Sequence, residues 1–195
     1  MLKLTSTSIR KRMSSSLFLM ICLIGATYEL QAQNRYYIEE GKVAFESDAP
    51  LELIKASTGS ILGILDREKK AFAVSIPIST FRGFNAPLQR EHFNENYMET
   101  EKYPKGIYKG LITDDIDFTK NGYYTVTTEG KLLLHGIEQA RTIKCDIVVE
   151  DDVVRLASKF QVELEEHNIK VPTIVSRKLS EVITVNIEAD FVLKK

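Results

Sequence analysis

Cysteine is too scarce in this chain to build a disulfide scaffold. The sequence contains only Cys22 and Cys145, and Cys22 falls in an N-terminal segment that we expect to be removed. One remaining cysteine cannot form an internal disulfide, so stability must come from buried apolar side chains. Residues 33–195 are long enough to form one domain with a sizeable core.

Neither sign of charge is in excess. The chain has 26 Lys and Arg residues against 27 Asp and Glu residues. Removing residues 1–32 takes away four basic residues and one acidic residue, which leaves a net charge of about −4. A nucleic-acid surface needs clustered positive charge to displace phosphate counterions. The sequence therefore predicts no nucleic-acid partner.

Recognisable catalytic signatures are also missing. There is no G-x-S-x-G elbow, P-loop or G-x-G-x-x-G fingerprint. The three histidines, His92, His135 and His167, are far apart and form no H-x-x-x-H pair. The sequence thus predicts no catalytic residue, no metal and no cofactor. A metal site assembled in space, from His92 and Glu95 or from His135 and a distant acid, stays an alternative.

No apolar run is long enough to cross a bilayer. Leu17–Ala26 (LFLMICLIGA) follows a basic patch at residues 10–12 and has the length of a secretory-signal core. Ala32 offers a small residue at a cleavage position. We therefore expect residues 1–32 to be a signal peptide and residues 33–195 to be a periplasmic or secreted protein that does not span the membrane. An N-terminal helix buried within the domain is the alternative.

What the sequence has in abundance is alternation of apolar and polar residues with a period of two. It is clear at residues 71–78, 143–149, 154–164 and 183–191. Such alternation turns one apolar face of an antiparallel sheet inward, and strands recurring every ten to twenty residues indicate an all-β sandwich or barrel. Cys145 shares the inward parity of Ile143 and Ile147, which predicts a small buried hydrophobe and not a nucleophile.

Two segments depart from this alternation. Leu88–Thr100 is the best helical candidate, because Phe93 and Tyr97 are four residues apart and lie on one helical face. The acidic run Asp114, Asp115 and Asp117 lacks the glycine turn and the distal glutamate of a calcium loop, so a solvated loop is expected.

Three segments carry a family resemblance. The first, at residues 92–110 (HFNENYMETEKYPKGIYKG), joins the aromatic pair to a Lys-Tyr-Pro sequence and a strand that ends in Gly110. The second, GKLLLHGI at residues 130–137, matches G-x-L-T-[IL]-H-G-[VI], with Leu133 in place of the usual Thr. The third, at residues 171–187, is a weaker match. Together they resemble the YceI-like family of exported β-barrels, over Lys42 to Leu193.

The resemblance implies an antiparallel, eight-stranded, lipocalin-like barrel with a short helical segment near its rim. Such a barrel would hold a polyprenyl lipid, an isoprenoid quinone or another fatty amphiphile in an apolar cavity. His135 would anchor the turn at Gly136. The expected cavity residues are the inward parity set with the aromatic pair: Val43, Phe45, Phe72, Val74, Ile76, Ile78, Phe93, Tyr97, Tyr108, Leu132, Leu134, Ile143, Ile147, Phe160 and Ile187.

Two other functions stay open. The first is a structural or interaction barrel, because eight strands enclose a volume that side chains can fill. The second is an enzyme that acts on a lipid-like substrate. A cavity would distinguish the carrier from the filled barrel, and a polar pair with shifted pKa values at its mouth would support the enzyme.

Overall fold

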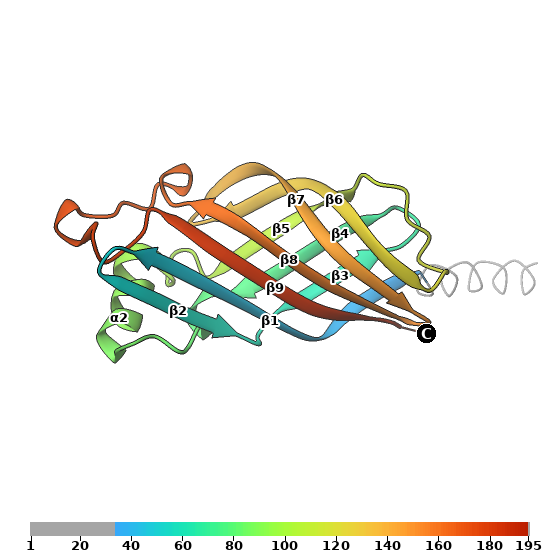
Figure 1. Cartoon of the computed structure of the whole chain (residues 1–195), viewed down its shortest axis with the longest axis horizontal. Coiled ribbons are helices and arrows are strands. Elements are labelled where there is room, and N and C mark those ends of the chain that lie inside the picture. Colours follow the sequence, from blue (N-terminus) through green and yellow to red (C-terminus); the bar gives the residue numbers. More distant parts are fainter. Residues whose placement is uncertain (1–33, 195) are drawn as a thin grey trace, which may run out of the picture.

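The computed structural model describes residues 34–194. The predicted signal peptide, residues 1–32, lies outside this range. Nine strands form one antiparallel sheet that closes on itself (Figure 1). The strands are β1 (Arg35–Ala49), β2 (Glu52–Thr58), β3 (Leu62–Asp66), β4 (Ala71–Pro77), β5 (Lys105–Ile112), β6 (Gly122–Leu134), β7 (Ile137–Glu150), β8 (Val153–Glu163) and β9 (Val182–Leu193).

The barrel has eight strand positions because β2 and β3 share one. Both strands pair with β1 and keep the same register on it, as Val43 faces Thr58 and Tyr37 faces Ile64. From β3 onward each strand pairs with the next, and β9 pairs with β1 to close the ring. The predicted eight-stranded antiparallel barrel is therefore confirmed, with one strand interrupted at residues 59–61.

The alternation in sequence becomes the inner and outer faces of the barrel wall. Along β7, Ile143, Cys145 and Ile147 are buried, whereas Lys144 and Asp146 between them are exposed. Burial raises the pKa of the Cys145 thiol, which keeps this group protonated and apolar. Cys145 is thus the small buried hydrophobe that its parity predicts.

Two glycines allow β5 and β6 to approach closely. Gly110 faces Gly130 across these strands. A Cβ atom on Gly110 would lie 2.1 Å from the carbonyl oxygen of Glu129, and one on Gly130 would lie 2.4 Å from that of Lys109. Only glycine fits both positions.

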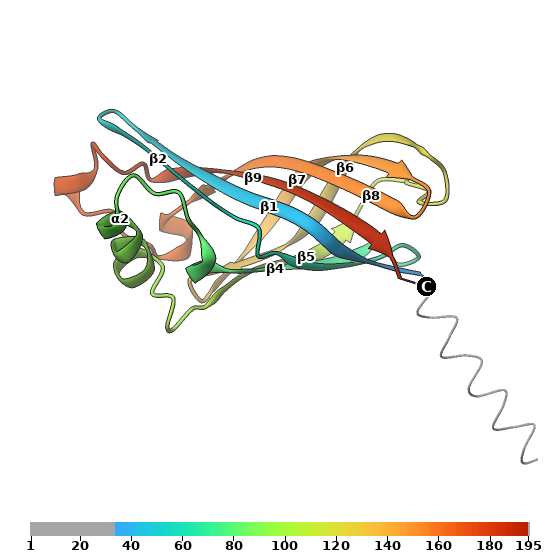
Figure 2. The same ribbon diagram turned by 90° about the horizontal axis from the view of Figure 1, so that it is seen from below.

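A helical segment fills the side of the barrel that β2 leaves unpaired. Besides its pairing with β1, β2 makes one isolated β-bridge within the described chain, Ser57 to Arg82. After β4 the chain forms η1 (Ile78–Thr80), α2 (Pro87–His92) and the π-helical turn η2 (Phe93–Tyr97). The helix predicted at Leu88–Thr100 is confirmed but ends earlier, because Glu99 adopts a left-handed conformation with φ of 42°. Figure 2 shows α2 at the same end of the barrel as the β1–β2 turn.

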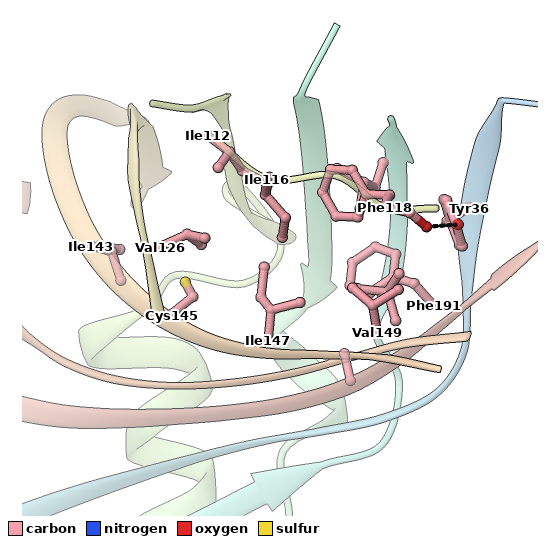
Figure 3. Close-up of a cluster of buried hydrophobic side chains, with 13 residues drawn as sticks. Tyr36, Ile112, Ile116, Phe118, Val126, Ile143, Cys145, Ile147, Val149 and Phe191 are labelled. Carbon is pink, nitrogen blue, oxygen red and sulfur yellow. Dashed lines mark hydrogen bonds between the residues drawn. The ribbon is translucent and has the colours of Figure 1, made fainter. Parts of the chain in front are cut away.

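The loop of residues 113–121 covers the opposite end. Its aspartates, Asp114, Asp115 and Asp117, are exposed, as expected of a solvated loop, but Ile116 and Phe118 between them are buried. The hydroxyl of Tyr36 donates a hydrogen bond to the carbonyl oxygen of Phe118 at 3.4 Å (Figure 3). We call the end of the barrel that this loop covers the closed end. Strand β1 begins there and strand β9 ends there (Figure 1).

Two further short helices, η3 (Glu165–His167) and η4 (Thr173–Val175), lie between β8 and β9. The segment that contains them lies at the end opposite the closed end, together with α2 and the β1–β2 turn (Figure 1). We call this the open end.

Candidate ligand-binding cavity

The barrel encloses an apolar cavity of about 350 Å³. Its wall consists of inward side chains from the strands together with side chains of the helical segment. Exposed His92 and Lys178 also line it, so the cavity reaches solvent at the open end. At the closed end it stops against a cluster that includes Tyr36, Ile116 and Phe118 (Figure 3). This volume is within the usual range for small-molecule sites.

The structure brings together all but one of the predicted cavity residues. Those that line the cavity are Val43, Phe45, Phe72, Val74, Ile76, Ile78, Phe93, Tyr97, Tyr108, Leu132, Leu134, Ile147, Phe160 and Ile187. Ile78 lies in η1, Phe93 and Tyr97 lie in η2, and the others come from seven different strands between β1 and β9. At the strand positions, parity agrees with the inner face of the wall.

Ile143 is the exception, because the structure does not place it among the residues that line the cavity. It is buried and inward, yet it packs in the cluster with Val126 and Cys145 and does not reach the cavity (Figure 3). Its strand partner Thr128 lines the cavity instead. Parity determines the face on which a side chain lies, but it does not determine which neighbours cover that side chain.

Four phenylalanines form one wall near the open end. The ring of Phe93 packs against Phe45, Phe81 and Phe84, with centroid distances of 5.3, 5.9 and 5.1 Å. Phe45 also contacts Phe81 at 5.3 Å. Sequence reasoning missed Phe81 and Phe84, which follow β4 outside any alternating run. The F-x-x-F spacing of residues 81–84 was the one signal that could have found them.

The few polar groups inside the cavity bond to one another or to the backbone. The hydroxyls of Tyr108 and Thr128 lie 3.0 Å apart, and the Thr128 hydroxyl also donates to the carbonyl oxygen of Ile143 at 2.9 Å. Burial raises the pKa of Tyr108 above its ordinary value, and burial likewise raises that of Tyr97. Both phenols are therefore neutral at physiological pH, and the interior carries no charge at these positions.

Polar side chains gather where the cavity meets solvent. Glu52, Gln89, His92 and Lys178 all line this rim. The Gln89 amide donates to the Glu52 carboxylate at 2.6 Å and joins α2 to the start of β2. No sequence signal pointed to this set, because its members come from three segments that only tertiary packing brings together.

His135 is buried but does not line the cavity, and it links two neighbouring segments of the chain. Its two ring nitrogens lie 3.0 Å from the carbonyl oxygen of His167 and 3.0 Å from the Glu99 carboxylate. Tyr103 packs against this ring at 4.6 Å, beside Gly136 with its φ of 76°. His135 thus anchors the turn at Gly136, as the sequence predicts.

Residues 34–194 contain no group of three or more His, Cys, Asp or Glu side chains placed to hold a metal ion. In the same range, no helix has the length and apolar character needed to cross a membrane.

Known proteins share both a sequence family and a fold with this chain. The model of the YceI-like domain matches residues 40–191. No curated protein matches the chain significantly.

Several solved structures share the fold. A polyisoprenoid-binding domain from Saccharophagus degradans, implicated in plant cell wall breakdown, aligns with a TM-score of 0.69 and 10% identity, over 82% of this chain and 98% of that domain. BcnA of Burkholderia cenocepacia aligns with a TM-score of 0.63 and 12% identity, over 77% and 95% of the two chains. The YceI protein of Campylobacter jejuni aligns with a TM-score of 0.54 and 17% identity, over 67% of this chain and 78% of that protein.

Proposed function

Because the chain belongs to the YceI-like domain family, we propose that it is an exported carrier that holds one long-chain amphiphile, such as a polyisoprenoid or an isoprenoid quinone, in its barrel. The observation that carries this proposal is a cavity that is lined mostly by apolar side chains and is polar at the rim where it meets solvent. An amphiphile has the same arrangement, an apolar chain joined to a polar head.

The energetics favour such a ligand. Moving a methylene group from water into an apolar site gains about 0.8 kcal/mol. A chain of about twenty carbons would gain roughly 16 kcal/mol, which exceeds most estimates of the cost of association. The description of the Saccharophagus degradans domain as polyisoprenoid-binding supports the same class of ligand.

The cavity also favours a carrier over the filled barrel. Small residues leave space between large neighbours: Gly106 and Ala189 both line the cavity, and Ala189 is only 3% exposed. A purely structural barrel would fill this volume, since an apolar void forfeits contacts that packed side chains would make.

The proposal requires no catalytic step. Its ligand is held by burial alone, and the polar groups inside the cavity, Tyr108 and Thr128, are engaged with each other and with the backbone.

Export is part of the proposal and rests on residues 1–32. The basic patch, the short apolar run and Ala32 together suit a cleaved signal. N-terminal sequencing of protein from fractionated cells should begin at or near Gln33. Cytoplasmic protein that starts at Met1 would contradict export and leave the cavity argument untouched.

The decisive experiment identifies what the barrel contains. Lipids extracted from natively purified protein should give a long-chain amphiphile by mass spectrometry, in a fixed ratio to protein. Ala189→Phe places a ring in the cavity and should reduce that ratio several-fold. Lys159→Glu, on an exposed outward position of β8, is the matched control and should leave it unchanged.

Circular dichroism must first show that both variants are folded, because overpacking costs about 1–3 kcal/mol. A folded wild-type protein that contains no long-chain lipid, and that takes up none when offered, would refute the carrier.

A further inference from the structure

Exposed apolar side chains surround the open end of the barrel. Leu51 and Leu53 lie at the β1–β2 turn, Leu88 in α2, Ile174 in η4 and Val182 at the start of β9. Ile174 is 93% exposed. The other large hydrophobic side chains exposed in the described range, Leu62, Leu111 and Tyr123, lie on β3, β5 and β6.

Hydrogen bonds join the segments that carry these side chains. The backbone N–H of Leu51 donates to the carbonyl oxygen of Arg177 at 2.9 Å, which ties the β1–β2 turn to the loop after η4. The side chain of Asn85 donates to the carbonyl oxygen of Leu53 at 3.0 Å, and Gln89 binds Glu52. The segments that carry these side chains therefore lie together at the end of the molecule at which α2 lies (Figures 1 and 2).

The loop of residues 168–180, which contains Ile174, is purely cationic. It carries Lys170, Arg177 and Lys178 and no acidic residue. All three cations are exposed, and none takes part in an ion pair that the structure shows among residues 34–194. They are thus available to an external anion.

We propose that this open end docks on an anionic lipid bilayer, with Ile174 inserted among the acyl chains and the three cations on the head groups. A highly exposed isoleucine beside unpaired cations has the composition of an interfacial membrane anchor. The inference rests on the proposed function, because a ligand with a long apolar chain has its reservoir in a membrane.

The same loop connects the membrane contact to the cavity. Val175, Lys178 and Leu179 line the cavity, while their neighbours Ile174 and Arg177 point out of it into solvent. At the closed end, exposed Asp115 and Asp117 pair with Lys70 and Lys120 at 2.9 and 3.2 Å, so these loop carboxylates already have cationic partners. The unpaired cations and the exposed apolar side chains of the open end together orient the barrel with its opening toward the bilayer.

Insertion of the loop into the bilayer can be measured by the fluorescence of a tryptophan introduced there, because the chain has no tryptophan of its own. In Ile174→Trp, vesicles of phosphatidylcholine and phosphatidylglycerol with brominated acyl chains should quench the fluorescence and shift it to the blue. Leu111→Trp, on an exposed site of β5 near the closed end, is the matched control and should show neither change.

The cations are tested by Lys170→Gln together with Arg177→Gln, both outside the cavity lining. Affinity for vesicles of equal parts phosphatidylcholine and phosphatidylglycerol should fall about fivefold for each cation removed. Binding of wild type should also weaken with added salt and on pure phosphatidylcholine. Uptake of a soluble fluorescent fatty-acid probe should be unchanged in this variant.

The outcomes separate docking from carriage. Equal quenching at positions 174 and 111, or none at 174, overturns the docking proposal, and a wild type that still takes up the probe leaves the carrier intact. A concentration-dependent dimer without vesicles, disrupted by Ile174→Asp, would assign the surface to a second copy of the chain and overturn membrane docking as well. A wild-type protein that takes up no fatty-acid probe would contradict the proposed carrier function itself.

Discussion

The ring of Phe93 stacks on the ring of Phe45, with centroids 5.3 Å apart and planes inclined by 16°. Phe45 belongs to β1 and Phe93 to the π-helical turn η2. The contact therefore joins the helical segment to the strand that closes the barrel. It also places an aromatic wall beside the cavity opening, where β2 has no neighbouring strand on its outer edge.

Removing this ring should loosen the open end. Phe93 is half-buried, so Phe93→Ala should cost about 2 kcal/mol of unfolding free energy, less than the roughly 3–5 kcal/mol of a fully buried ring. Urea denaturation measures the change, and bound lipid should dissociate faster. Leu88→Ala, on the exposed face of α2, is the control and should alter neither. A denaturation midpoint equal to that of the wild type would show that the aromatic wall contributes nothing.

Substitution by alanine should affect stability very differently at two glycines of β5. A Cβ atom on Gly110 would lie within 2.1 Å of a backbone oxygen, whereas one on Gly106 would meet only the side-chain ends of Ile78 and Leu134, at 3.4 and 3.5 Å. Gly110→Ala should therefore destabilise the barrel by about 2–3 kcal/mol, and Gly106→Ala should be nearly neutral. Thermal melts of the two variants test this, and equal melting temperatures would contradict it.

A charge inside the cavity should abolish uptake. Ile76 lines the cavity from β4, and Ile76→Glu would bury a carboxylate without a partner at a cost of several kcal/mol. A bound chain would have to cover that charge, so binding of a fluorescent polyprenyl or fatty-acid probe should fall below detection. Lys159→Glu adds an acidic side chain on the outer face and should bind the probe as the wild type does. Only variants with wild-type circular dichroism are compared.

Stability should decline on mild acidification because of His167. This side chain is fully buried, and burial lowers the pKa of its imidazole below the ordinary 6.5, with the Arg141 cation acting in the same direction and Glu166 against it. The unfolded chain binds the proton at the ordinary pKa, so folding releases it. Stability is thus full above about pH 6.5 and falls as the pH drops toward the folded value.

Urea midpoints measured between pH 7.5 and about pH 5.5 should record this decline. His167→Gln retains a donor for the carbonyl oxygens of Leu134 and Ile137, which the ring nitrogen contacts at 3.2 Å, and its midpoint should depend less on pH. An unchanged pH dependence in the variant would assign the decline to other groups.

Much of the wall was predictable because strand alternation is local. Ile76 and Phe160 each lie in a run whose polar neighbours show the outward face, and both line the cavity. Phe81 and Phe84 lie outside such runs, and Glu52, Gln89 and Lys178 come to the same cavity only after three distant segments pack together. Ile116 and Phe118 were hidden in the same way, within an acidic loop whose apolar residues cover the closed end.

The sequence by itself determined the strands and their inner faces, since a period of two acts between near neighbours. Tertiary structure alone decided that β2 and β3 share one place in the ring, and that Ile143 is covered while Ile147 meets the cavity. The physical reason is that the position of a residue along the barrel axis, and therefore its neighbours, depends on the register of every strand in the ring. It also depends on the loops that close each end of the barrel.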